Sequence, residues 1–413
     1  MNKRIDQCRI CGNIHLVEVL DLGVQALTGV FPQTRSQPIT RGPLRLVKCM
    51  GDDVCGLLQL QHSYDLSEMY GLSYGYRSGL NKSMVEHLHG KVRRILPRVE
   101  LSADSLVIDI GSNDSTTLQA YPKSVGNLVG VDPTGVKFGH FYPPHIKLIP
   151  DFFSARRVRD AFGAKKAAVI TSFSMFYDLE EPLVFMQDVF DSLDAEGIWV
   201  FEQSYMPTML EKNSYDTVCH EHLEYYGLKQ IQWMAKRVGL TIVDVEFNDV
   251  NGGSFSVVAA KTGSRQAKNA KAIDGLLDSE KRLGMDTLKP YIEFAARAQA
   301  SRETLVGFID SAIQTGKTVC ALGASTKGNV VLQYCGLDEK RINRIGEVNE
   351  TKFGCFTPGS LIPIVPEDEL LKTDPDHLLV LPWHFRTFFE KSASLKGRNL
   401  LFPLPTLESV RRH

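Results

Sequence analysis

The triplet His220-Glu221-His222 brings together side chains suited to proton transfer near neutral pH. A histidine holds or releases a proton in that range, and a neighbouring carboxylate suits general base chemistry. The two histidines are two positions apart rather than four, so the triplet differs from the helical zinc motif H-E-x-x-H. An extended segment would put both histidines on one face with Glu221 opposite, whereas a helix would separate them. The triplet is therefore the strongest candidate for catalysis, and a solvated surface cluster is the alternative.

A second chemical signal is a group of four cysteines within the first 60 residues, namely Cys8, Cys11, Cys49 and Cys55. The C-x-x-C spacing of the first pair lets two sulfurs bind one ion, and the glycine after each pair allows the backbone to bend around the metal. Five residues separate the second pair, which is wider than usual. Four thiolates leave no open coordination position, so the pattern predicts a structural zinc site. The alternatives are unrelated buried thiols and, less favoured, a redox motif.

Composition limits the class of protein that carries these residues. With 413 residues, 43% hydrophobic and 23% charged, the chain is long enough for two or three globular domains. A net charge of -1 gives no general attraction to nucleic acid or to membranes. The sequence shows neither an apolar signal region nor a window of about 18 to 20 apolar residues, so we expect a cytoplasmic protein without membrane association.

The elements that must position these residues follow an alternating α/β pattern from about residue 100 onward. Seven strands are predicted, at 106–110, 128–132, 146–149, 168–172, 198–202, 240–245 and 255–260. The last two are close enough to form an antiparallel pair. This arrangement favours the seven-stranded sheet of class I methyltransferases over a six-stranded dinucleotide sheet.

The first predicted strand runs into a loop with four candidate cofactor-binding residues, Asp109, Gly111, Asn113 and Asp114. Gly111 permits a tight turn and a close approach of the backbone to a ligand. The loop lacks the G-x-G-x-x-G pattern that places a pyrophosphate on a helix N-terminus, which disfavours NAD.

Two further positions support an adenosine ligand. Asp132 ends the second predicted strand about 20 residues later, where a carboxylate can accept both ribose hydroxyls. Asp151, Phe152 and Phe153 follow the third strand and offer an acceptor for an exocyclic amine and an aromatic face for a purine. Taken singly, Asp132 could be a strand-end cap and Phe152 plain core. The ordered set favours S-adenosylmethionine.

The last third of the chain predicts a long charged helix over 274–315 and then a second strand–loop–helix unit. Its loop resembles a phosphate cradle, although the order of a P-loop is absent. Lys352 and His384 follow later strands and add a cation and an aromatic ring for a nucleotide. The candidate substrate-binding residues of this part are Ser325, Thr326, Lys327, Asn329, Lys352 and His384. Ordinary surface loops are the alternative. Two such sites in one chain imply a methyl donor and a phosphorylated substrate.

Together these motifs, with Tyr74 to Asn81 between the cysteines and the cofactor loop, resemble the sugar C-methyltransferases that act on nucleotide-linked 4-keto-6-deoxysugars. The resemblance implies a zinc-binding substrate domain at 1–75, an S-adenosylmethionine domain at 76–265 and a Rossmann-like nucleotide-sugar domain at 266–413. It also implies a dTDP or GDP carrier and a monomer. The overall expectation is an α/β protein of three such parts.

The resemblance further assigns roles to single residues. His222 matches the base that removes the carbon-3 proton, Glu221 matches its neighbouring acid, and Tyr76 could stabilise the developing oxyanion. Tyr74 and Tyr76 are expected to bind the substrate, and Asn81 is expected to bind the cofactor. Cys219, just before the triplet, and Ser115 depart from the family pattern, which makes a different sugar plausible. The alternatives are methylation of an oxygen or another carbon, a zinc-ribbon nucleic-acid methyltransferase, and a binding protein without activity.

Overall fold

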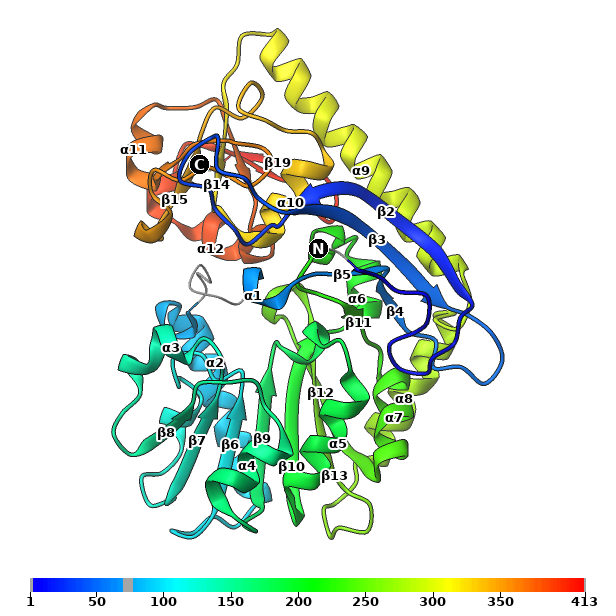
Figure 1. Cartoon of the computed structure of the whole chain (residues 1–413). Helices are drawn as coiled ribbons and strands as arrows, with labels where there is room; N and C mark the ends of the chain where they lie inside the picture. The colour runs from blue at the N-terminus through cyan, green and yellow to red at the C-terminus, as the bar shows by residue number, and fades with distance from the viewer. Residues whose placement is uncertain (1–2, 70–76, 412–413) are drawn as a thin grey trace.

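The computed structural model describes residues 3–69 and 77–411. A seven-stranded sheet lies at one end of the molecule and a six-stranded sheet at the other, with the long N-terminal strands beside the junction (Figure 1). Both termini lie away from the seven-stranded sheet in this view.

The seven-stranded sheet has the strand order of a class I methyltransferase, with every strand parallel except β13. In spatial order its strands are β12 (Leu240–Asn248), β13 (Ser254–Lys261), β10 (Leu193–Ser204), β9 (Ala167–Phe173), β6 (Leu106–Ile110), β7 (Asn127–Val131) and β8 (Ile146–Ile149). All seven predicted strands are confirmed, with small shifts at their ends. The largest difference is β10, which begins five residues earlier than predicted and continues to Ser204.

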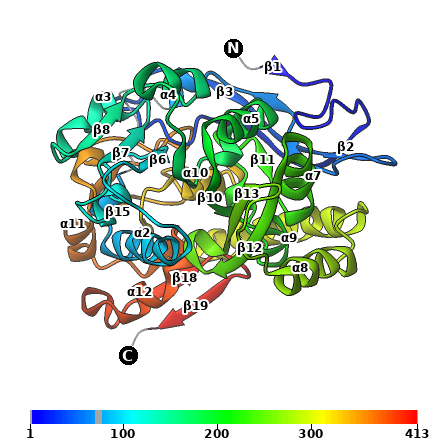
Figure 2. The same ribbon diagram turned by 90° about the horizontal axis from the view of Figure 1, so that it is seen from below.

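Helices cover both faces of this sheet, so its central strands are buried on both sides. The α2 helix (Lys82–Ile95) lies on one face, and α4 (Ala155–Phe162) and α5 (Pro182–Ser192) lie on the other (Figure 2). Alternate residues of β6 accordingly enter different cores, with Val107 packing in the cluster of α2 and Ile108 in the cluster of α5. The α7 helix (Leu228–Val238) and α8 (Ala270–Arg282) pack beside β12.

The N-terminal sheet recruits a strand from the middle of the chain. Its antiparallel order is β11 (Glu224–Tyr225), β4 (Leu58–Leu60), β3 (Arg41–Cys49) and β2 (Leu16–Ala26). A two-stranded pair, β1 (Lys3–Arg4) and β5 (His62–Ser63), lies beside it. Because β11 begins two residues after His222, the candidate catalytic segment is fixed by pairing with β4.

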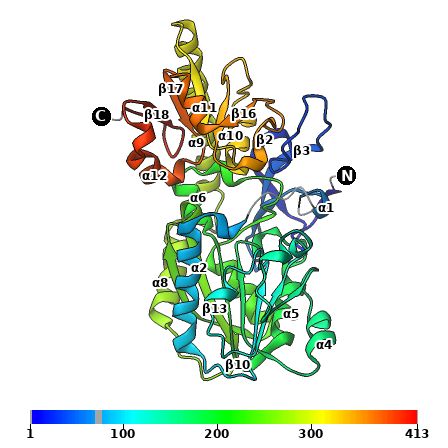
Figure 3. The same cartoon turned by 90° about the vertical axis from the view of Figure 1, so that its left-hand side faces the viewer.

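The C-terminal sheet is parallel except for β19 at one edge. Its order is β16 (Ile364–Pro366), β15 (Ile345–Glu347), β14 (Val319–Leu322), β17 (His377–Val380), β18 (Asn399–Phe402) and β19 (Glu408–Arg411). The helices α10 (Thr326–Tyr334), α11 (Glu367–Lys372) and α12 (Arg386–Lys391) accompany it. A second α/β unit is therefore confirmed (Figure 3).

One prediction about helices is wrong in its extent. The stretch 274–315 is not one helix, since α8 ends at Arg282 and α9 runs over Lys289–Gln314. Gly284 has φ +71° in the break, and Pro290 lies in the first turn of α9, where its missing N–H costs no hydrogen bond. The α9 helix runs along β2 toward the C-terminal sheet (Figure 1). Its buried residues belong to one hydrophobic core that includes residues of both the N-terminal and the C-terminal sheet.

Among the described residues, we find no helix that is both long enough and apolar enough to cross a membrane.

Candidate active site

The four N-terminal cysteines form a cluster whose geometry suits one metal ion. Their sulfur atoms all lie within 4.8 Å of one another, with 3.5 Å between Cys8 and Cys55 and 3.6 Å between Cys11 and Cys49. A tetrahedral zinc ion with Zn–S bonds of about 2.3 Å needs sulfurs about 3.8 Å apart. Gly12 and Gly56 both have φ +69°, so the bends expected after each pair are present. These four side chains would hold a structural zinc ion.

A cavity of about 240 Å³ opens at the carboxyl ends of β6, β7, β9 and β10. This is where ligands bind in open α/β sheets. Six of the predicted cofactor residues line it, namely Asp109, Gly111, Asn113, Asp132, Phe152 and Phe153. Gly111 has φ +70°, which allows the turn that carries the backbone past the cavity. Asp109 is buried, and burial raises the pKa of its carboxyl group to about 7.

Asp132 holds the cavity wall together through its carboxylate. Its Oδ2 accepts a hydrogen bond from the Asn113 backbone N–H at 2.7 Å, and its Oδ1 accepts from the Thr134 N–H at 2.7 Å. Each carboxylate oxygen can accept more than one hydrogen bond. Asp132 can therefore shape the loop and still accept from a ribose hydroxyl.

We expect Asp132→Asn to weaken S-adenosylmethionine binding by about 10- to 100-fold, because one oxygen acceptor becomes an amide donor. Isothermal titration calorimetry with S-adenosylmethionine measures this loss. The matched control is Asp104→Asn, since Asp104 is an exposed acid in the turn before β6 that pairs with Lys165. Equal affinities of the two variants would contradict a direct role for Asp132.

Three predicted cofactor residues do not line this cavity. The Asp114 Oδ2 accepts from the Gly79 N–H at 2.9 Å, Asp151 pairs with Arg157 on the outside, and the Asn81 Oδ1 caps the N-terminus of α2. Their role toward the cofactor stays a prediction. Tyr74 and Tyr76 lie outside the described residues.

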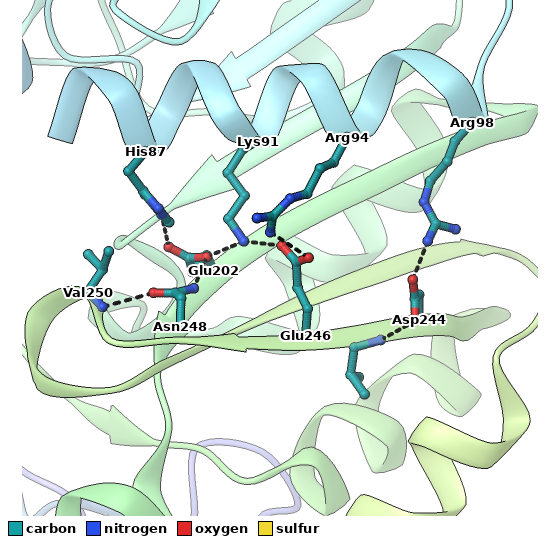
Figure 4. A network of polar contacts seen from close by, with 10 residues as sticks. His87, Lys91, Arg94, Arg98, Glu202, Asp244, Glu246, Asn248 and Val250 are labelled. Carbon is teal, nitrogen blue, oxygen red and sulfur yellow. Dashed lines mark hydrogen bonds and ion pairs between the residues drawn. The ribbon is translucent and has the colours of Figure 1, made fainter. Parts of the chain in front are cut away.

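The sequence interpretation missed an ionic network beside the cavity (Figure 4). Glu202, near the end of β10, lines the cavity and is 3% exposed. Its Oε1 contacts the His87 Nε2 at 2.5 Å, and its Oε2 contacts the Lys91 Nζ at 2.6 Å and the Asn248 amide at 2.7 Å. Despite burial, these partners lower the pKa of Glu202. Glu202 is thus an ionised carboxylate at the cavity wall.

A sequence signal for this network does exist. Basic residues recur along α2 and the turn after it at His87, Lys91, Arg94 and Arg98, a spacing that places them on one helix face. Lys91 and Arg94 both pair with Glu246 of β12, and Arg98 pairs with Asp244. A stripe of this kind indicates an acidic partner surface.

His222 lies in a second, smaller cavity with Tyr177, Ser204, Met206, Met209, Thr217, Glu224 and Tyr225. The two cavities are neighbours, because the same two segments contribute to both walls. Tyr177 and Ser204 line the cavity of His222, whereas Asp178 and Glu202 line the cofactor cavity. The His222 Nδ1 lies 2.8 Å from the Thr217 carbonyl oxygen. The centres of the His222 and Tyr177 rings lie 4.4 Å apart in an edge-to-face arrangement. Burial and the charge of Lys327 lower the pKa of His222 to about 3.

The other members of the triplet point elsewhere. His220 is fully buried, with its Nε2 3.4 Å from the Gly42 carbonyl oxygen and its ring against Tyr64. Glu221 accepts a hydrogen bond from the Thr28 hydroxyl at 3.3 Å, and burial raises the pKa of its carboxyl group. The carbonyl oxygen of Thr217, rather than Glu221, is the partner that orients the His222 ring.

The predicted C-terminal residues gather around the start of α10. The Ser325 hydroxyl caps this helix, and the Asn329 amide donates to the Thr28 carbonyl oxygen at 2.7 Å. The Lys352 Nζ donates to the Ala324 carbonyl oxygen at 2.7 Å. Asn329 thus joins the C-terminal part to the N-terminal segment.

Lys327 and His384 lie near each other at the same junction. Burial lowers the pKa of Lys327, although the negative charge of Asp216 acts to raise it. Burial and Lys327 lower the pKa of His384 to about 3. A Cβ added to Gly252, two residues after Val250 of the cofactor cavity, would lie 3.9 Å from the Cβ of His384, so the loop of Gly252 approaches His384.

Family models match three consecutive parts of the chain. Residues 8–70 match a zinc binding domain, residues 84–245 a methyltransferase domain, and residues 249–405 the C-methyltransferase C-terminal domain. The C-methyltransferase NovU of Streptomyces niveus is 28% identical over 408 residues, which are 97% of this chain and 96% of NovU.

Two solved structures of methyltransferases match less than half of this chain. A chain of the complex between the Haloferax volcanii Trm112 methyltransferase activator and a methyltransferase is 14% identical, with 45% of this chain and 94% of that chain covered and a TM-score of 0.37. The N-methyltransferase NodS of Bradyrhizobium japonicum is 13% identical, with 44% and 98% covered and a TM-score of 0.32.

The strand order, the cavity at the strand ends and the cysteine cluster define an S-adenosylmethionine-dependent methyltransferase with a zinc-binding N-terminal part. Within that class, the chain matches the model of the C-methyltransferase C-terminal domain over residues 249–405 and is similar to the C-methyltransferase NovU along almost its whole length.

Proposed function

We propose that this C-methyltransferase transfers the methyl group of S-adenosylmethionine to carbon 3 of a nucleotide-linked 4-keto-6-deoxysugar. The observation that carries the proposal is the position of His222, a neutral imidazole in a pocket next to the cofactor cavity. A ketone at carbon 4 acidifies the hydrogen on carbon 3, so a positioned imidazole can act as the general base that forms the enolate.

The hydrogen bonding of His222 selects the nitrogen that acts as the base. In the neutral ring the Nδ1–H donates to the Thr217 carbonyl oxygen, which leaves the Nε2 lone pair free to take the carbon-3 proton. The electron pair of the broken C–H bond moves onto the ketone oxygen. When bound, S-adenosylmethionine would supply an electrophilic methyl group. Carbon 3 of the enolate would form the new bond to the methyl carbon as the ketone re-forms, and the electron pair of the S–CH₃ bond would stay on sulfur in S-adenosylhomocysteine.

Positive charge at the junction suits the rest of the substrate. Lys327 is a half-buried cation close enough to His222 to lower its pKa, so phosphates bound there would place the attached sugar near the base. We assign Ser325, Thr326, Asn329, Lys352 and His384 to the same nucleotide site, and Tyr74 and Tyr76 to the sugar. The family resemblance favours a dTDP or GDP carrier and a monomeric enzyme. We place the reaction in the cytoplasm, where the zinc-binding thiolates would stay reduced.

The reaction is tested by mass spectrometry of the protein with S-adenosylmethionine and a panel of nucleotide-4-keto-6-deoxysugars. The expected product carries one added methyl group, and NMR of the product should place it on carbon 3. A methyl group on an oxygen or on another carbon would keep the enzyme class and overturn the proposed acceptor.

The pH dependence tests the base. Because the pKa of His222 is lowered to about 3, the imidazole stays neutral above that pH and should not limit activity near neutrality. Lys327→Met removes one of the two causes of this lowering, so the pKa of His222 should rise and the acid limb of the kcat profile should move to higher pH. The matched control is Lys352→Met, which removes a different lysine of the same part. An unmoved acid limb in Lys327→Met would count against His222 as the titrating base.

A further inference from the structure

The first metal-binding turn contains an arginine that reaches far beyond the metal site. Arg9 lies between Cys8 and Cys11, and its side chain is 3% exposed. A buried guanidinium is costly unless its donors are paired. The contacts of Arg9 are therefore informative about what its position does for the enzyme.

Arg9 joins the metal-binding turn to the N-terminal sheet. Its Nη1 donates to the Leu60 carbonyl oxygen at 2.6 Å and its Nη2 to the Ser63 hydroxyl at 2.9 Å. Its backbone N–H donates to the Gln59 side chain at 3.1 Å. Leu60 and Gln59 belong to β4, the strand that pairs with β11 directly after His222.

Arg9 also reaches the wall of the cofactor cavity. Its Nε lies 3.4 Å from the Glu180 Oε2, which accepts a second hydrogen bond from Ser63 at 2.7 Å. Glu180 lines the cofactor cavity together with Asp178 and Leu179. The same segment begins with Tyr177, whose ring contacts His222.

The segment that carries His222 lies between these two attachments. The Leu223 N–H donates to the Tyr177 carbonyl oxygen at 2.9 Å, and the Leu223 carbonyl oxygen accepts from the Leu60 N–H at 2.8 Å. Arg9 thus holds the segment 177–180 on one side of Leu223 and β4 on the other. Movement of the metal-binding turn would displace both the segment 177–180 and β4 relative to Leu223.

We propose that Arg9 is a positioning residue, through which the metal-binding turn fixes the segment 177–180 against the cofactor and holds the base beside it. The zinc site then supports cofactor binding as well as folding of the N-terminal sheet. The cofactor part of the proposal does not depend on which acceptor is methylated, so a negative result with keto sugars leaves it standing.

Calorimetry with S-adenosylhomocysteine on the full chain tests the proposal, with zinc content measured in parallel. Arg9→Gln should weaken this binding by about five- to tenfold while zinc stays bound. Glu180→Gln, which leaves the metal-binding turn intact, should weaken it to a similar degree. The matched control is Arg45→Gln, because Arg45 forms an ion pair with Asp21 in the same sheet, away from the cavity; its affinity should equal that of the wild type.

The double variant separates positioning from independent effects. If Arg9 acts through Glu180, Arg9→Gln/Glu180→Gln should bind S-adenosylhomocysteine no more weakly than the weaker single variant. Two losses that add in free energy would overturn the proposal. Wild-type affinity in Arg9→Gln, or a loss that occurs only when zinc is also lost, would overturn it as well.

Discussion

Replacing His222 by asparagine is expected to lower kcat for methyl transfer by about 10³-fold, because general base catalysis contributes about 10²- to 10⁴-fold. Asparagine keeps a polar side chain of smaller size but has no basic nitrogen. The cofactor cavity is lined by other residues, so the affinity for S-adenosylhomocysteine should stay within about twofold of the wild type. Steady-state kinetics and calorimetry on the same preparation measure both quantities.

The neighbouring histidine supplies a matched control. His220 lies two residues before His222 in the same segment. Its ring, however, is fully buried against Tyr64 and lies outside both cavities. His220→Asn should therefore lower the melting temperature and leave kcat of the folded enzyme within a few fold of the wild type. Equal loss of kcat in both variants would mean that the whole segment has been disturbed and that His222 has no special role.

Hydrogen exchange isolates the proton-transfer step. In D₂O with S-adenosylhomocysteine bound, the wild type should exchange the carbon-3 hydrogen of a keto sugar that it accepts, because the base works without methyl transfer. His222→Asn should not catalyse this exchange. Exchange at the wild-type rate in His222→Asn would assign the base to another residue.

The seven-stranded sheet could be predicted because each of its strands contains a short, largely apolar run. β6, for example, is buried at every position and reads as five residues in which only Asp109 is polar. The break between α8 and α9 was missed because it is short and lies between two charged stretches that both favour a helix. Its signals, Gly284 and Pro290, are local and are outweighed by the helical pattern on either side.

Site residues could be predicted where the end of a strand places a residue at the cavity. Asp132 and Gly111 are of this kind, since the strand–turn–helix order fixes their position. Glu202 and Arg9 act through partners from distant parts of the chain, and a single sequence does not show these pairings. Glu221 illustrates the same limit, because its contact with Thr28 depends on how the N-terminal segment folds over the triplet.

The zinc site carries the second large effect, because one ion would cross-link four cysteines from separate parts of the N-terminal segment. Apart from β2 and β3, its strands are two or three residues long, and such strands fold poorly without a cross-link. Cys11→Ser should abolish stoichiometric zinc binding and lower the melting temperature by about 10 °C or more, given the large contribution of structural zinc to folding.

The same variant should lose methyl transfer at temperatures where the rest of the chain is still folded. β4 comes from the N-terminal segment and pairs with β11, so loss of the metal releases the strand that follows His222. Elemental analysis, calorimetric melting and activity at several temperatures check this. The matched control is Cys355→Ser, a cysteine of the C-terminal part outside the cluster, which should keep its zinc and its activity. If Cys11→Ser keeps full activity without zinc, the metal has no role in holding the base, and the N-terminal sheet must be stable through its packing against α9 alone.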